Sequence, residues 1–227
     1  MSSTISTYVF DAYGTLFDVH SAVARHAARI GPAAAEFSEL WRARQVEYSW
    51  TSSLMGHKTD FWALTQLALD YSMQRFGIVD DTLRTDLLSA YLELEAFPEV
   101  PQMLRSLKAC GAQAVILSNG TSEMVNSAVR SAGLSGLIDR VMSVDEVGIF
   151  KPHASVYDLV PRRLAVSAHQ ISFQSCNPWD AAGAAHYGFR VVWVNRKGLP
   201  AEYPFAGERR EVASLEGLAS LWRGAHD

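Results

Sequence analysis

Short apolar runs alternate with segments of helical periodicity along this chain, and that alternation constrains its fold more than any other feature. The runs that predict strands are residues 8–10, 114–117, 140–143, 171–173 and 191–194. Helices are predicted at residues 100–108, 121–132, 153–164 and 179–187, and at the end of the chain around Leu215, Leu218 and Leu221. Pro161 must kink or end its helix, because proline has no amide donor. The alternation implies an α/β fold, with a parallel sheet joined by right-handed crossovers.

Residues 17–97 interrupt this alternation with a block that predicts only helices. Phe37, Trp41 and Arg44 recur at steps of four and three, as on one face of a helix. Asp80, followed by Asp81, predicts the N-cap of a later helix. Because the block leaves from the end of the first strand, we expect an all-helical cap subdomain (17–97) over that edge of a core domain (1–16 and 98–227).

Composition excludes several classes of function. The apolar content of 48% can fill a large core, and a net charge of −4 does not suit a nucleic-acid binder. Lysine and arginine are scattered, so no membrane-surface patch is predicted. Residues 1–7 are polar and contain no apolar signal region, and two cysteines in unrelated contexts predict no disulfide framework. We therefore expect a cytoplasmic protein.

Polar clusters stand where three of the predicted strands end. Asp11 follows the first strand, Ser118 and Asn119 the second, and residues 175–177 a later one, with Asp180 just beyond. Strand ends of a parallel sheet share one edge, so these groups should line one cleft. There a carboxylate can act as a nucleophile. The alternative is an ordinary strand-end Asp that caps the next turn.

Lys151, in the Lys-Pro pair of a predicted loop, is the cation expected beside Asp11. Two unit charges about 4 Å apart attract by about 4 kcal/mol at an effective dielectric constant near 20. Lys151 would therefore keep Asp11 ionised and offset its repulsion of an anionic substrate.

Taken together, these segments resemble the haloacid dehalogenase superfamily and, within it, the L-2-haloacid dehalogenases. The matching pieces are residues 10–19, 40–42, 117–120, 151–152 with Val156-Tyr157, and 175–180. Phosphate-transferring relatives carry a second acid two residues after the nucleophile, where this chain has Tyr13, and a later Asp where it has Cys176. A neutral thiol is a poor ligand for Mg²⁺. The resemblance therefore implies a Rossmann-like core that displaces halide from carbon without metal or organic cofactor.

The resemblance also implies a role for each matching residue. Asp11 would attack the halogen-bearing carbon to form an ester. Asp180 would then activate a water, helped by Lys151 and Asn177, and a 2-hydroxyacid would be released. Thr15, Ser175 and Tyr157 would orient Asp11, Asp180 and Lys151, respectively, by hydrogen bonds.

Other residues would hold the substrate. Ser118 and the backbone amides near Ala12 and Tyr13 would take its carboxylate. Arg42, Asn119 and Trp179 would receive the halide. The expected partners are a short 2-haloacid and water, with no nucleic acid and no membrane, and with a second copy of the chain in a homodimer.

Each of these residues also has a simpler interpretation. Arg42 could be a solvated helical arginine, and Ser118 and Asn119 could form a turn and N-cap. Tyr13 and Trp179 could be packing residues. Two other functions stay open: a Mg²⁺-dependent phosphatase of the same superfamily, and a non-catalytic binding protein that keeps the fold.

Overall fold

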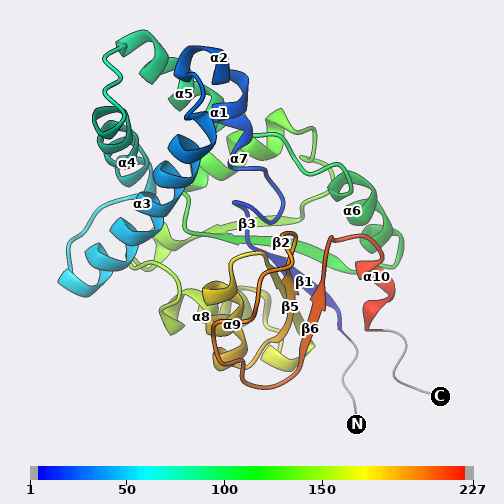
Figure 1. Ribbon diagram of the computed structural model, residues 1–227. Coiled ribbons are helices and arrows are strands. Elements are labelled where there is room, and N and C mark those ends of the chain that lie inside the picture. The colour runs from blue at the N-terminus through cyan, green and yellow to red at the C-terminus, as the bar shows by residue number, and fades with distance from the viewer. Residues whose placement is uncertain (1–4, 223–227) are drawn as a thin grey trace.

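The computed structural model describes residues 5–222, so residues 1–4 of the polar N-terminal segment lie outside it. Its centre is a six-stranded sheet in which neighbouring strands are parallel, in the order β3-β2-β1-β4-β5-β6 (Figure 1). The first strand lies in the middle, where Val9 pairs with Val115 on one side and with Phe173 on the other. The strands are β1 Thr7–Phe10, β2 Gln113–Ser118, β3 Arg140–Ser143, β4 Ile171–Ser175, β5 Arg190–Val194 and β6 Arg209–Val212. The predicted α/β fold with a parallel sheet is confirmed.

Helices surround the sheet, and five of them form a separate group. The α-helices are α1 Ser21–Arg25, α2 Ala27–Ile30, α3 Ala34–Met55, α4 Phe61–Arg75, α5 Asp81–Leu92, α6 Val100–Ala109, α7 Ser122–Ser131, α8 Ala154–Leu164, α9 Pro178–Tyr187 and α10 Leu218–Leu221, with 3₁₀ turns at Val144–Glu146 and Ala168–Gln170. In Figure 1, α1 to α5 gather beside the sheet, on the side toward which the chain leaves β1. We call residues 17–97, which contain these five helices, the insert.

Side-chain caps begin several helices where the sequence predicts them. The Asp80 carboxylate accepts from the Leu83 amide at 2.8 Å and starts α5. The Thr121 hydroxyl accepts from the Met124 amide at 3.2 Å and starts α7. Such bonds satisfy amides that would otherwise have no partner in the first turn.

Of the two outcomes expected at Pro161, a kink or the end of the helix, the end is excluded, because α8 continues to Leu164 as predicted, with the proline inside it. One strand differs from the sequence-based expectation. Strand β6 was not predicted, because its sequence, Arg-Arg-Glu-Val, is mostly exposed and polar. It pairs with β5 alone, at the edge of the sheet, where buried side chains are not required.

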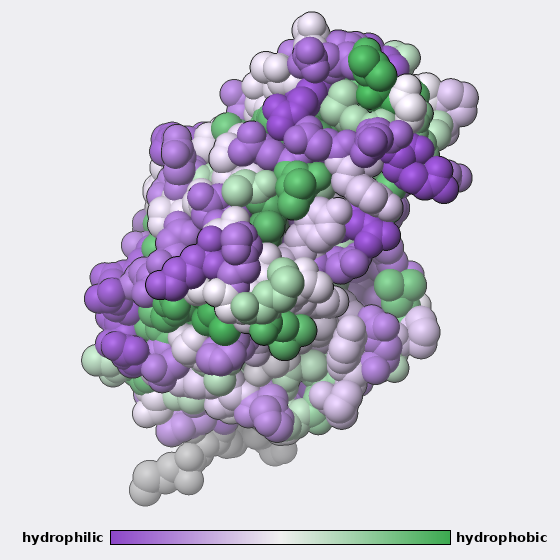
Figure 2. Space-filling model, turned by 90° about the vertical axis from the view of Figure 1, so that its left-hand side faces the viewer, coloured by the Kyte–Doolittle hydropathy of each residue, from purple (hydrophilic) through white to green (hydrophobic). Residues whose placement is uncertain are grey.

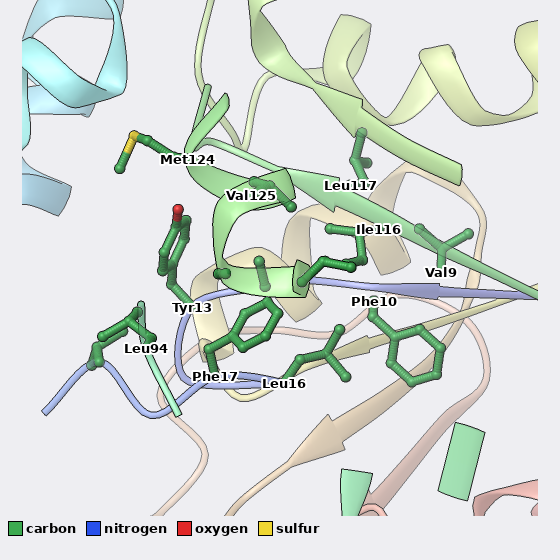
Figure 3. Packing of buried hydrophobic residues seen from close by; sticks show 14 of the residues in the cluster. Val9, Phe10, Tyr13, Leu16, Phe17, Leu94, Ile116, Leu117, Met124 and Val125 are labelled. Carbon is green, nitrogen blue, oxygen red and sulfur yellow. The ribbon is translucent and has the colours of Figure 1, made fainter. Parts of the chain in front are cut away.

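Hydrophobic packing fixes the loop that follows β1. Leu16 and Phe17 are completely buried, whereas Tyr13 extends from the loop toward Met124, away from Val9 and Phe10 on the strand (Figure 3). The loop is therefore anchored in the core at its far end.

The two chain segments that connect the insert to the sheet lie side by side. The Phe97 amide donates to the Leu16 carbonyl at 2.9 Å. Arg196, which follows β5, holds both segments: its guanidinium donates to the Thr15 carbonyl at 2.9 Å, pairs with Glu99 at 2.7 Å and lies 3.7 Å from the centre of the Phe97 ring. The position of the insert is thus tied to the loop that carries Asp11.

Apolar and hydrophilic side chains are mixed on the surface of the protein. The face shown in Figure 2 carries several apolar groups separated by hydrophilic side chains. Within residues 5–222, every helix is too short or too polar to cross a membrane.

Candidate active site

The polar residues that follow the strands converge at one edge of the sheet. Asp11 comes directly after β1, and Asn177 lies between β4 and the start of α9. Lys151 reaches the same place from the loop before α8. All three are linked by hydrogen bonds, so the convergence that the parallel sheet predicted is present.

Both oxygens of the buried Asp11 carboxylate accept hydrogen bonds. Lys151 Nζ donates to Oδ1 at 3.1 Å. Asn177 Nδ2 and Thr15 Oγ1 donate to Oδ2, at 2.8 and 3.1 Å. A carboxylate oxygen can accept about two such bonds, so Oδ2 is saturated while Oδ1 keeps one acceptor position.

Lys151 lies between two carboxylates. Its ammonium group is completely buried and donates to Asp180 Oδ2 at 2.9 Å as well as to Asp11. Burial by itself would lower the pKa of Lys151, but the two negative charges and their hydrogen bonds outweigh it and raise that pKa. The ammonium group therefore stays charged and compensates the two acids.

Asp180 is completely buried in the first turn of α9. Burial raises its pKa to about 6, the charge of Asp11 adds to the rise, and Lys151 and Tyr157 act against it. Tyr157 was expected to orient Lys151, but its hydroxyl donates to Asp180 Oδ1 at 2.8 Å and to the Asp180 carbonyl at 3.2 Å. The physical reason is that the phenol proton needs an acceptor. An ammonium group can only donate, whereas the Asp180 carboxylate can accept.

Ser175 also differs from its expected role. Its hydroxyl accepts from the Asn177 amide at 3.1 Å and donates to the Asn177 carbonyl, so it shapes the turn that presents Asn177, whereas a bond to Asp180 was expected. Thr15 does contact Asp11, and its hydroxyl accepts from the Cys176 amide at 2.9 Å. The loops after β1 and β4 are thereby joined.

Two buried donors near these acids have no hydrogen-bond partner among the described residues: the Tyr13 hydroxyl and Arg42 Nη1. Burial raises the pKa of Tyr13 well above its usual value, so its phenol keeps its proton. Tyr13, Arg42 and Asn177 border a hollow of about 420 Å³ between the insert and the loop after β5. Tyr13 and Arg42, each with a buried donor that lacks a partner among the described residues, therefore both border this hollow.

The remaining predicted substrate residues lie around the same edge of the sheet. Ala12 is buried next to Asp11, and Ser118 is completely buried and accepts from the Gly120 amide at 3.0 Å. Asn119 accepts from the Lys151 amide at 2.9 Å through Oδ1, which leaves its Nδ2 to donate elsewhere. Trp179 lies edge-on to Trp50 of α3, with ring centres 5.2 Å apart. The structure thus gives Trp179 a packing contact, the simpler of its two interpretations.

Two side chains of the insert stack on the Tyr13 ring: Tyr91 and Phe61, with ring centres 5.6 and 6.0 Å away. The sequence pointed to Phe61 as a packing residue of an apolar pocket, but it did not place Tyr91 or Gln45 near the site. Gln45, buried in α3, accepts from the Tyr91 hydroxyl at 3.2 Å. Gln45 lies four residues after Trp41, on the same face of the predicted helix. A glutamine on a face that is otherwise apolar could have indicated a buried hydrogen-bond partner there.

The donor set does not fit the magnesium ion that phosphate-transferring relatives use. Burial raises the pKa of Cys176 to about 12, so its thiol is neutral, and Lys151 already occupies one oxygen each of Asp11 and Asp180. Hard cations need several anionic or carbonyl oxygens. Within residues 5–222, no three His, Cys, Asp or Glu side chains are grouped as metal ligands.

Known proteins similar to this chain are named as dehalogenases. A family model described as haloacid dehalogenase-like hydrolase matches residues 5–188. (S)-2-haloacid dehalogenase 1 of Pseudomonas sp. (strain CBS-3) is 47% identical over 218 residues, which cover 96% of both chains. (S)-2-haloacid dehalogenase 4A of Burkholderia cepacia is 43% identical over 222 residues, covering 97% of this chain and 96% of the relative.

Solved structures agree. The L-2-haloacid dehalogenase from Xanthobacter autotrophicus, solved with chloropropionic acid covalently bound, is 33% identical and has a TM-score of 0.89 over 98% of this chain and 100% of the other. A further dehalogenase crystal structure is 42% identical, with a TM-score of 0.94 over 97% of this chain and 98% of that one. This protein therefore belongs to the haloacid dehalogenase-like hydrolases, in the group formed by the (S)-2-haloacid dehalogenases.

Proposed function

We propose that this protein is a hydrolase that removes the halogen from short L-2-haloacids and releases D-2-hydroxyacids and halide. The observation that carries the proposal is the buried Asp11 carboxylate, held by Lys151, Thr15 and Asn177, with Tyr13 in the place of a second acid. A phosphate ester needs a proton or a metal ion on its leaving oxygen. A halide leaves without either, so this donor set favours displacement at carbon over phosphate transfer.

In the first step, Asp11 Oδ1 attacks C2 of the haloacid. Oδ1 is the attacking atom because it keeps an acceptor position, whereas Thr15 and Asn177 saturate Oδ2. The new C2–Oδ1 bond forms as the carbon–halogen bond breaks, and the halide departs with the bonding electron pair. Attack from the side opposite the halogen inverts C2 and converts the L configuration into the D configuration.

In the second step, water attacks Cγ of the Asp11 ester while Asp180 accepts a proton from it. Negative charge then develops on Oδ2, at which Asn177 and Thr15 already donate from 2.8 and 3.1 Å. Donors fixed in advance at the developing charge are an effective form of catalysis. The Cγ–Oδ1 bond then breaks and Oδ1 takes the proton that Asp180 holds, so Oδ1 leaves as the hydroxyl oxygen of the product. The water oxygen stays on Asp11, and the second proton of the water passes to solvent as the Asp11 carboxylate is restored.

The substrate lies between the edge of the sheet and the insert, which acts as a cap. Its carboxylate binds Ser118 and the amides near Ala12 and Tyr13. The halide leaves toward Arg42, the only cation among these residues that comes from the insert, and toward the Asn119 amide. In support of this placement, Arg42 has a buried donor without a partner on the described residues. Trp179 is retained as a halide contact on the strength of the family resemblance alone.

The test is halide release, measured by ion chromatography, from the two enantiomers of 2-chloropropionate. The L form should release chloride, the D form should not, and Asp11→Asn should abolish release. A single turnover in heavy-oxygen water should label Asp11 and leave the hydroxyacid unlabelled. Chloride release by Asp11→Asn at the rate of the unmodified protein, with deamidation excluded by mass spectrometry, would refute the covalent step.

Metal independence is part of this proposal. Activity should be unchanged by EDTA, because the donor set around Asp11 does not suit a hard cation. The phosphatase alternative makes the opposite prediction, namely hydrolysis of p-nitrophenyl phosphate that EDTA stops.

Two wider proposals concern the setting of the enzyme. The exposed side chains of Leu54, Met55, Leu67 and Tyr71, on α3 and α4, support a homodimer formed through the insert. Light scattering on the purified protein gives the mass that tests this. Both cysteines are free, which supports a location in the cytoplasm, and cell fractionation tests it.

A further inference from the structure

We propose that Tyr91 and Gln45, two buried side chains of the insert, are positioning residues that hold the Arg42 guanidinium toward the substrate. The inference rests on the proposed function, in which Arg42 meets the departing halide. It concerns neither the acids nor the substrate contacts described above, but the means by which the insert keeps its one active-site cation in place.

A chain of hydrogen bonds links Tyr91 to the backbone of α4. The Tyr91 hydroxyl donates to Gln45 Oε1 at 3.2 Å, and Gln45 Nε2 donates to Thr65 Oγ1 at 2.9 Å. The Thr65 hydroxyl donates in turn to the Phe61 carbonyl at 2.7 Å. Gln45 and Thr65 are completely buried and Tyr91 is 2% exposed, so water does not compete for these bonds.

The direction of this chain is fixed from its far end. The Thr65 proton is used on the Phe61 carbonyl, so Thr65 can only accept from the Gln45 amide group. Gln45 must then present its carbonyl oxygen to Tyr91, which uses the Tyr91 proton. What remains on the Tyr91 hydroxyl is its lone pairs, which accept from a donor. The insert thus offers an oriented acceptor next to Arg42.

Arg42 lies beside this acceptor. It directly follows Trp41, whose ring centre is 5.2 Å from that of Tyr91, and its charge lowers the pKa of Tyr91 against the larger, raising effect of burial. Arg42 Nη1 is buried without a partner among the described side chains. The proposed contact joins this guanidinium, which has a donor to spare, to the lone pairs left on the Tyr91 hydroxyl.

Ring packing fixes the Tyr91 hydroxyl independently of its hydrogen bonds. Its ring packs against those of Tyr13 and Trp41, with centres 5.6 and 5.2 Å away. Trp41 is anchored as well, because its Nε1 donates to the Thr65 carbonyl at 2.9 Å. Arg42 follows Trp41 directly, so the same contacts fix its backbone and, through Tyr91, its side chain.

The test compares three variants with the unmodified protein. Tyr91→Phe removes one hydroxyl and keeps the ring, and Gln45→Met removes the acceptor. Ser72→Ala is the matched control, because the buried Ser72 hydroxyl of α4 donates only within its own helix, to the Ala68 carbonyl at 2.8 Å. With L-2-chloropropionate we expect kcat to fall about tenfold in the first two, KM to change less than about twofold, and the control to match the unmodified protein.

Each substitution is also made in an Arg42→Met variant, and its effect on kcat is compared in the two backgrounds. The comparison distinguishes a loss of Arg42 positioning from general structural damage. If Tyr91 acts through Arg42, then Tyr91→Phe lowers kcat in the unmodified protein and has no further effect in Arg42→Met. An equal loss in both backgrounds, or no loss in the unmodified protein, overturns the proposal. Should Tyr91→Phe not fold, the same cycle with Gln45→Met decides. Absence of chloride release from the unmodified protein would instead contradict the proposed function itself.

Discussion

Tyr157→Phe should move the pH dependence of ester breakdown to higher pH. The Tyr157 hydroxyl donates to Asp180 Oδ1 at 2.8 Å, and this bond lowers the pKa of Asp180 against the larger, raising effect of burial. A hydrogen bond to an ionised group is worth about 1.5–3 kcal/mol, and about 1.4 kcal/mol corresponds to one pKa unit. Loss of the hydroxyl should therefore raise the pKa of Asp180 by about one to two units.

The sign follows from the role of Asp180. Protonated Asp180 cannot accept a proton from water, so ester breakdown slows as the pH falls through its pKa, and a higher pKa moves that decline upward. Burial and the charge of Asp11 raise the pKa of Asp180 to about 6 before substrate binds. Esterification removes the Asp11 charge, so the decline in the unmodified protein should lie below about pH 6.

The assay is a single turnover of L-2-chloropropionate, quenched at intervals over a series of pH values, with the ester fraction read by intact-protein mass spectrometry. Tyr187→Phe is the control, because its ring lies 6.1 Å from that of Tyr157 but its hydroxyl donates to Asp158. The control should keep the pH dependence of the unmodified protein. An unchanged pH dependence in Tyr157→Phe would refute the assignment of Asp180 as the base.

Three further predictions follow from the same geometry. Asp180→Asn should release one equivalent of halide per active site and accumulate the ester, which intact mass would detect; steady turnover would argue against the second step. Lys151→Met should lower the free energy of unfolding by about 3–5 kcal/mol in denaturant titrations, because two buried carboxylates lose their counter-charge. Gly120→Ala would put a Cβ 2.7 Å from the Tyr13 ring and should cost about 1–3 kcal/mol and much of the activity, whereas Gly136→Ala, with nothing within 4 Å, should be silent in both measurements.

The parts of the fold that were predictable from sequence are those with a local chemical signal. Apolar runs placed β1, β2 and β4, and Asp80 and Thr121 marked helix starts that the structure contains. Strand β6 carries no such signal, since it pairs along one edge only and most of its side chains face solvent. Pro161 left a kink or an end of its helix open, and the structure excludes the end, because the buried residues of α8 on both sides of the proline pack on the core.

The site was predictable to the level of which residues meet, because parallel strands bring their ends together. The particular partners were not. Tyr157 and Ser175 each had more than one acceptor within reach, and only the three-dimensional structure selects Asp180 for one and the Asn177 backbone for the other. Arg42 could be assigned to the pocket only through the family resemblance, since a lone arginine on a helix has no distinctive sequence signal.

Mutations in the insert and mutations at the edge of the sheet should affect different properties of such an enzyme. Of the residues proposed to act on the substrate, Arg42 alone belongs to residues 17–97, and the others stand at the edge of the sheet. Mutations within residues 17–97 that spare Arg42 and the side chains proposed to hold it can therefore reshape the walls of the pocket, and with them the range of acids accepted, while Asp11, Lys151 and Asp180 stay unchanged. Selection for a new substrate should therefore change residues in the insert, whereas selection for a higher rate of carbon–halogen cleavage should change residues at the edge of the sheet.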